Sequence, residues 1–152
     1  MNRANKENSV SSDDLLPFHL SLRVTSFEDT RKFYGQILGL EERRSTATSI
    51  HFNMYGSQLT LHEIKDYSAL NIQREVDAED VPVPHFGFAL PTKESFYQVA
   101  KQLKDANAKF VREPGLRFLG KIFEQYVLFV LDPAGNGIEI KSFVHAEKGQ
   151  WL

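Results

Sequence analysis

The stretch PHFGFAL, residues 84–90, repeats the order of features found in PFHLSLRV, residues 17–24. Both stretches alternate as a β-strand does when one of its faces packs on a core. The apolar face carries Phe18, Leu20, Leu22 and Val24 in the first stretch and Phe86, Phe88 and Leu90 in the second. We therefore expect Phe18, Phe86 and Phe88 in the core. The opposite face of each stretch carries one histidine, His19 or His85.

A helical pattern follows each of these strands. TSFEDTRKFYGQILGL (25–40) has Ser26 and Asp29 as a capping box and Gly39 as a C-terminal stop. PTKESFYQVAKQLKDAN (91–107) has Phe96, Val99, Ala100 and Leu103 at helical spacing. Further strands are expected near 41–44, 49–54 and 58–64, and again near 109–113, 126–131 and 137–143. Aligning His19 with His85 superimposes the two halves at an offset of 66 residues, which indicates an internal repeat.

The repeat predicts an α+β fold built from two βαβββ modules. We expect the modules at residues 15–64 and 84–145, in a single domain over 15–145, with a polar connecting segment over 65–83. The polar residues 1–14 are predicted to be a disordered tail, and 146–152 a C-terminal tail. Because one helix covers only one face of a sheet, two modules side by side predict an eight-stranded, cupped sheet with its helices outside.

Composition limits the class of protein. The 152 residues (17.4 kDa) are 41% hydrophobic, which suits one globular domain. A net charge of -2 and a pI near 6.2 give no electrostatic case for binding nucleic acid or an anionic membrane. No apolar run approaches the roughly 20 residues that span a bilayer. The start, MNRANKENSVSSDD, lacks the apolar stretch of a signal peptide, so we expect a cytoplasmic protein.

The absence of cysteine excludes disulfides and thiolate metal sites. A metal site would therefore use histidine, aspartate, glutamate or water, which suit Fe(II), Mn, Ni, Zn or Mg. On the last strand Glu139 lies between Ile138 and Ile140, and alternation points it into the predicted cup. His19, His85 and Glu139 could then share one cavity as two histidines and one carboxylate, the ligand set of non-haem Fe(II) oxygenases.

Less demanding interpretations of these residues stay open. A lone histidine in a strand is often structural, and Glu139 could simply pair with Lys141, two residues along the same face. We interpret His51 as structural or exposed and His145 as solvated. The segment GLRFLGK (115–121) is expected to be a loop before the seventh strand, either solvated or acting as a lid.

Four segments, PFHLSLRV, TRKFYGQILGL, PHFGFAL and LDPAGNGIEIK, resemble the glyoxalase/bleomycin resistance/extradiol dioxygenase superfamily, also called vicinal oxygen chelate proteins. The resemblance runs from Pro17 to Phe143 and is greatest to small single-domain predicted extradiol-type dioxygenases. It implies that His19, His85 and Glu139 bind a divalent metal, Fe(II) first, with Mn, Ni or Zn as alternatives. It also implies a small-molecule substrate with two adjacent oxygens, such as a catechol, and a homodimer in which modules of two chains pair.

The fourth strand bears on the reaction that the resemblance implies. Glyoxalase I enzymes place a fourth ligand there, whereas this chain has Thr60, with His62 one step further along. Extradiol enzymes use three ligands and an acid/base histidine nearby, a role for which His62 or Gln58 is the candidate. They often carry a tyrosine on the seventh strand, where this chain has Phe129. A glyoxalase-like isomerase or lyase and a non-catalytic binding or resistance protein remain the alternatives, although resistance-type relatives typically lack the metal triad.

Overall fold

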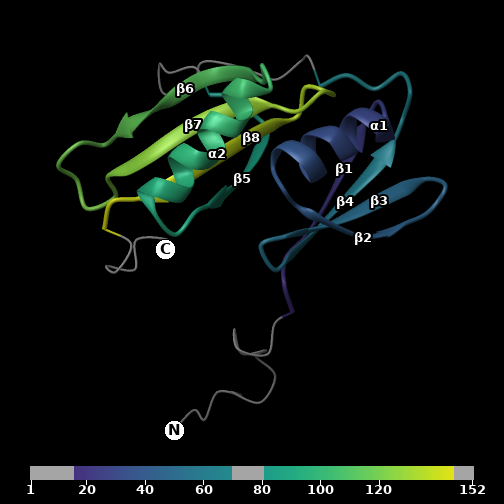
Figure 1. The fold of residues 1–152 in the computed structure, drawn as a ribbon, viewed down its shortest axis with the longest axis horizontal. Helices are drawn as coiled ribbons and strands as arrows, with labels where there is room; N and C mark the ends of the chain where they lie inside the picture. Colours follow the sequence, from purple (N-terminus) through teal and green to yellow (C-terminus); the bar gives the residue numbers. More distant parts are fainter. Residues whose placement is uncertain (1–15, 70–80, 146–152) are drawn as a thin grey trace, which may run out of the picture.

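The computed structural model describes residues 16–69 and 81–145, and in these each half of the sequence folds into the same order of elements (Figure 1). The first module consists of β1 (His19–Val24), α1 (Phe27–Thr30), η2 (Arg31–Ile37), β2 (Glu41–Ser45), β3 (Ser49–Met54) and β4 (Ser57–Glu63). The second consists of β5 (His85–Ala89), α2 (Lys93–Asp105), β6 (Lys109–Arg117), β7 (Gln125–Leu131) and β8 (Gly137–Phe143). The predicted tails and the middle of the predicted connecting segment lie outside the described residues.

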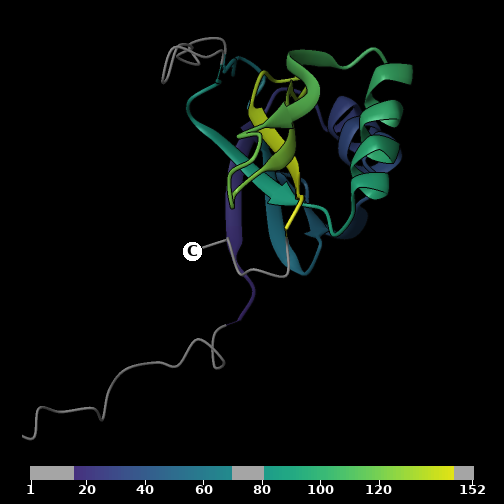
Figure 2. The same ribbon diagram turned by 90° about the vertical axis from the view of Figure 1, so that its left-hand side faces the viewer.

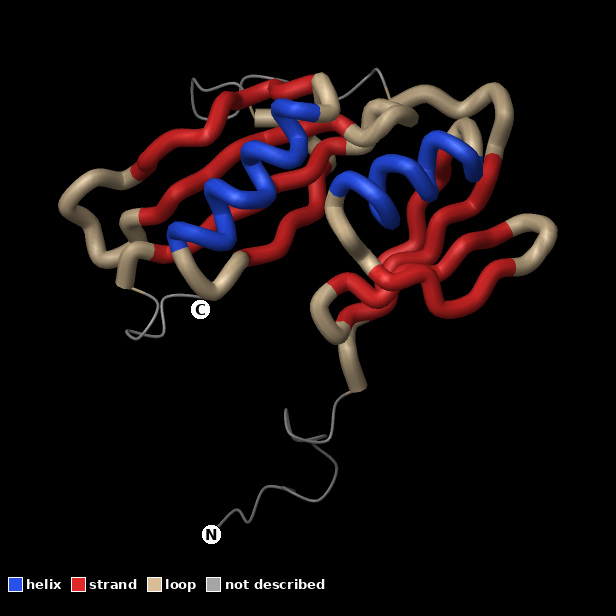
Figure 3. The backbone as a smooth tube through the Cα atoms, in the orientation of Figure 1, coloured by secondary structure: helices blue, strands red, loops and turns tan. Residues whose placement is uncertain are grey.

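The two sheets have equivalent topologies. Their strand orders are β1-β4-β3-β2 and β5-β8-β7-β6, and the first strand of each module runs parallel to the last. The predicted pair of βαβββ modules with eight strands is thus confirmed. Among the described residues the hydrogen-bonded ladders lie within the modules, so the strands form two four-stranded sheets (Figure 3). The helices lie on one side of the strands (Figure 2). We call the side of each sheet that packs on its helix the helix face, and the opposite side the open face.

The helix ends follow the sequence signals. Ser26 accepts a hydrogen bond from the Asp29 N–H (3.2 Å), as predicted, and the Phe27 N–H donates to Glu63 Oε1 (2.8 Å). After Thr30 the turns widen into the π-helix η2, and the chain leaves the helix at Gly39, whose φ of 72° suits glycine. The predicted face of α2 is buried: Phe96, Val99, Ala100 and Leu103. No helix among the described residues is long and apolar enough to cross a membrane.

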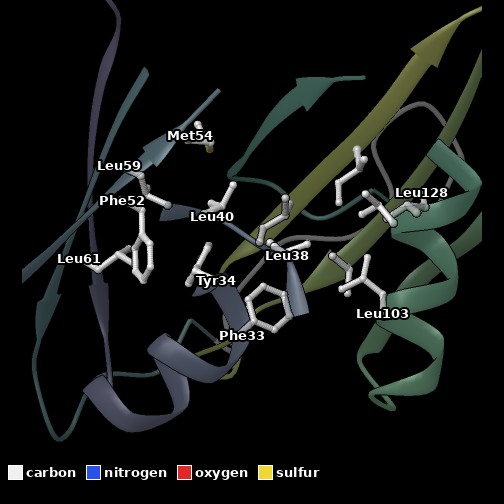
Figure 4. Close-up of a cluster of buried hydrophobic side chains, with 14 of the residues drawn as sticks. Phe33, Tyr34, Leu38, Leu40, Phe52, Met54, Leu59, Leu61, Leu103 and Leu128 are labelled. Atoms are coloured by element: carbon white, nitrogen blue, oxygen red, sulfur yellow. The ribbon is translucent and has the colours of Figure 1, made fainter. Parts of the chain in front are cut away.

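One apolar core joins the two modules (Figure 4). In Figure 4 the first-module helix lies between its own sheet and the second module, with Phe33 and Leu38 towards Leu103 and Leu128. The prediction for Phe18 is wrong, because its side chain is 65% exposed. Phe18 precedes β1, an edge strand, and burial on the helix face of this strand increases only towards Val24. Phe86 and Phe88 are half-buried against the core.

The segment GLRFLGK differs in part from its prediction as a loop. Strand β6 continues to Arg117, where this residue pairs with Gln125 of β7. The pairing register between the two strands shifts on either side of Arg112. The hydrogen-bonded pairing of β6 with β7 therefore continues beyond Pro114. The connection between β6 and β7 therefore begins at Phe118.

A buried hydrogen-bond network ties the two modules together at Asp132. Tyr34 of η2 donates its hydroxyl to Asp132 Oδ2 (2.8 Å), and the Asn136 side chain donates to the same oxygen (2.8 Å). Asn136 also donates to the Arg23 carbonyl of β1 (2.9 Å). Burial raises the pKa of Asp132 and raises the pKa of Tyr34 well above its ordinary value. The turn between β7 and β8 is thereby fixed against the first module.

Replacing Tyr34 by phenylalanine is expected to lower the free energy of unfolding by about 1.5–3 kcal/mol, because a buried carboxylate loses one of its donors. Urea denaturation at neutral pH measures the effect. The matched control is Tyr55→Phe, since the Tyr55 side chain is 55% exposed, and this change should cost less than about 0.5 kcal/mol. Equal losses from the two variants would show that the contact with Asp132 does not stabilise the fold.

Candidate functional site

His85, at the start of β5, is held in one orientation by the backbone. Its Nδ1 lies 2.6 Å from the Pro82 carbonyl oxygen. Because a carbonyl only accepts hydrogen bonds, Nδ1 must carry the proton, and the lone pair of a neutral ring is left on Nε2. Metal-binding histidines are typically fixed in this way, with one ring nitrogen donating to a carbonyl and the other free for the ion.

Glu139 of β8 faces that free nitrogen. Its side chain is only 12% exposed, and its Oε2 lies 3.8 Å from His85 Nε2. Two ligands each about 2.1 Å from one ion lie at most about 4.2 Å apart, so both atoms fit the first coordination shell of a single ion. Lys141 Nζ also lies 2.8 Å from Glu139 Oε2, so the alternative Glu139–Lys141 pair is present as well. A cation at this carboxylate would share it with Lys141.

Small residues and one aromatic ring shape the space around this pair. A Cβ atom on Gly137 would lie 3.1 Å from the His85 Cβ and 3.0 Å from the Pro82 Cβ. The Phe129 ring is buried and meets the His85 ring edge-on, with 5.2 Å between the centroids. Phe129 is paired with Glu139 across the strands β7 and β8. It therefore holds the imidazole in place on the open face but offers no hydroxyl group.

Replacing Gly87 by alanine is expected to displace Glu139 and to weaken metal binding. The added Cβ would lie 2.7 Å from the Glu139 carbonyl oxygen and 3.0 Å from its Cβ, so the two strands must move apart. We expect a loss of about 1–3 kcal/mol in the free energy of unfolding. Urea denaturation and a metal titration measure the two effects. Gly115→Ala is the control, because its Cβ would meet no atom closer than 3.9 Å. Tight metal binding by Gly87→Ala would contradict the geometry.

The remaining predicted site residues lie on the open face of the first module. His19 of β1 pairs in register with Gln58 of β4, and Thr60 and His62 follow Gln58 on the same face. His19, Gln58 and His62 are exposed, whereas Thr60 is 4% exposed. These residues form a polar surface on the sheet of the first module, whereas His85 lies on the sheet of the second.

His51 of β3 lies at the centre of this polar surface. Its Nδ1 lies 3.0 Å from both Gln58 Nε2 and Thr60 Oγ1, and its Nε2 lies 3.2 Å from Ser49 Oγ. Burial lowers the pKa of His51, and the nearby charges of Arg44, His62 and His19 lower it further. From its sequence, His51 is predicted to be structural or exposed; in the structure it is buried. The sequence signal for the position of His51 is strand alternation. Ile50 and Phe52 share the helix face, which places His51 on the open face.

The structure brings His85 and Glu139 together but keeps His19 apart from them within one chain. Among residues 16–69 and 81–145, no group of three histidine or acidic side chains is placed to hold an ion. The pocket beside His85, of about 370 Å³, is lined from β1 by Leu20 and Leu22. These leucines lie on the helix face of β1, whereas His19 lies on its open face. The predicted ligands thus lie on different sheets, and we call His19 on the first and His85 with Glu139 on the second the two candidate half-sites.

Known proteins share this architecture. A glyoxalase/bleomycin resistance protein/dioxygenase from Alicyclobacillus acidocaldarius, known from a crystal structure, has 27% sequence identity to this chain. The two structures align with a TM-score of 0.68, over 86% of this chain and 93% of that one. A glyoxalase/dioxygenase from Nostoc punctiforme is 19% identical, with a TM-score of 0.65 over 91% and 99% of the two chains. The fosfomycin resistance protein FosX from Listeria monocytogenes is 17% identical, with a TM-score of 0.63 over 86% and 94%. The last two show a shared fold alone.

The family is shown by the sequence itself. No curated protein sequence matches the chain closely enough to count as a relative. The family model described as Glyoxalase/Bleomycin resistance protein/Dioxygenase superfamily matches residues 17–140, which is most of the chain and covers both modules. The protein therefore belongs to the glyoxalase/bleomycin resistance protein/dioxygenase superfamily.

Proposed function

We propose that this protein is a metal-dependent enzyme that binds two adjacent oxygens of a small substrate, and specifically an Fe(II)-dependent, extradiol-type dioxygenase acting on a catechol-like compound. The observation that carries the proposal is the orientation of His85. Its Nδ1–H donates to Pro82, and its free Nε2 faces a nearly buried carboxylate 3.8 Å away. A histidine that served only packing would not need its second nitrogen directed at an acidic oxygen.

We further propose that two copies of the chain complete each site. His19 of one copy would join His85 and Glu139 of the other, and a two-fold axis would create two such sites. β1 and β5 each form an edge of their sheet, which leaves room for the sheet of another copy beside each. Phe18 is 65% exposed, and Leu20 and Leu22 are only half-buried, so β1 presents an apolar edge that a second copy could cover.

The polar side chains around the half-sites have distinct roles in this proposal. When bound, a ferrous ion supplies Lewis-acid polarisation of the two substrate oxygens and the redox partner that dioxygen chemistry requires. His62 is the residue we assign to proton transfer, because imidazole is the side chain that most often acts as a general acid or base. The amide of Gln58 cannot do so, and it is held by His51 at 3.0 Å. Gln58 therefore orients the substrate.

The proposal is tested by purifying the protein without oxygen, measuring its metal content and recording oxygen uptake with a panel of catechols. Iron together with catechol-dependent oxygen uptake is the expected result. His62→Gln should retain the iron and lose most of the uptake, which separates proton transfer from metal binding. Zinc or nickel without oxygen uptake would overturn the dioxygenase assignment and favour isomerase chemistry. Protein that binds no divalent metal would overturn the enzyme assignment altogether.

A further inference from the structure

A second pocket, of about 550 Å³, opens on the first module. Its lining includes Arg43 and Arg44 of β2, His51 and Asn53 of β3, and Gln58 of β4. Asn53 lies in the same register row as Gln58 and His19, two strands away from His19. Two strand spacings of about 4.8 Å place Asn53 about 10 Å from His19. We call this hollow the Arg44 pocket.

A bulge in β2 directs Arg44 into this pocket. The pairing of β2 with β3 shifts register between Glu42 and Arg44, so that Arg44 pairs with His51. Bulges commonly change the direction of a side chain near a functional site. The neighbouring Arg43 is already paired with Glu41 (3.0 Å). No carboxylate among the described residues lies within ion-pair distance of Arg44, which leaves its guanidinium available to an anion.

The pocket offers hydrogen-bond donors around that positive charge. Asn53 Oδ1 accepts the Gly56 N–H (2.9 Å), so the amide nitrogen of Asn53 remains as a donor. Arg44 carries a permanent positive charge, which attracts an anion. Glu41 is the acidic residue in the register row of Asn53, and its charge is balanced by Arg43. The local charge is therefore positive although the whole chain has a net charge of -2.

We propose that the Arg44 pocket binds a carboxylate group of the substrate, with Arg44 as the charged partner and the Asn53 amide as a neutral donor. The inference deepens the proposed function, on which it rests for the identity of the ligand as substrate. A catechol that carries a short carboxylate side chain has the right chemistry at both ends. Its adjacent oxygens face the half-site at His19, and its carboxylate reaches two strands away. Arg44 would then determine specificity and take no part in the reaction itself.

The test uses benzoate as the probe and full-length, metal-free protein. A titration followed by NMR at constant ionic strength should shift the side-chain signals of Asn53 and Arg44. In Arg44→Gln the dissociation constant should rise at least about tenfold, the loss expected for a hydrogen bond to a charged group. Arg43→Gln is the matched control, because Arg43 also lines the pocket but is paired with Glu41, and it should change the constant less than about twofold.

Three outcomes would overturn the proposal. The first is that benzoate shifts no signal of the Arg44 pocket. The second is that Arg43→Gln and Arg44→Gln weaken binding equally, which would reflect general positive charge and not a site. The third is that uncharged benzyl alcohol shifts the same signals as strongly as benzoate. The titration involves neither metal nor oxygen, so its failure is distinct from failure of the proposed dioxygenase.

Discussion

The variant His85→Ala is expected to lose stoichiometric binding of a divalent metal ion, with the dissociation constant raised at least about 100-fold. Loss of a residue that merely orients a metal-binding histidine costs about 10- to 100-fold, and removal of the ligand itself costs more. His85 supplies a nitrogen that is already oriented by Pro82, and alanine leaves only the carboxylate of Glu139 on this half-site. Lys141 would then remain as the cation paired with Glu139.

Competition with a chelator, followed by elemental analysis of the protein, measures this loss. The matched control is His145→Ala. His145 follows β8 in the C-terminal region and is predicted from the sequence to be solvated. The control should bind metal like the unchanged protein, and both variants should give the circular dichroism spectrum of a folded chain. Unchanged metal content in His85→Ala would show that the assignment of this histidine is wrong.

The sequence predicted the modules well because their signals are local. Alternation, the Ser26 cap and the positive φ of Gly39 each depend on neighbouring residues, and all three appear in the structure. The extension of β6 to Arg117 was missed because Pro114 and Gly115 are typical of turns, and only pairing with β7 offsets that tendency. The exposure of Phe18 was missed because alternation shows which residues share a face and not how far the helix covers it.

The candidate site was predictable only within each module. Strand alternation placed Glu139 and His85 on the open face, and the register of β5 with β8 brings them together. The distance of His19 from this pair depends on how the helices pack between the modules, which no local pattern encodes. The position of Arg44 depends on a bulge, and the role of His51 depends on the partners that β4 provides. These features arise from pairing between segments and could not be read from a single strand.

The shared site predicts that two inactive variants will restore one another. His19→Ala breaks the half-site of the first module, and His85→Ala breaks that of the second. In a mixed dimer one site carries both defects, whereas the other combines the intact His19 of one chain with the intact His85 of the other. Random pairing makes half of the dimers mixed, and half of their sites are intact, so about a quarter of the metal-binding capacity returns.

The metal content of co-expressed His19→Ala and His85→Ala chains is therefore the most direct test of a site built from two copies. We expect the metal content to recover to about a quarter of that of the unchanged protein, from near zero for either variant alone. Co-expression of His85→Ala with Glu139→Ala should give no recovery, because both changes lie in the second module and every site stays broken. Metal content that remains near zero in the first mixture as well would contradict the shared site.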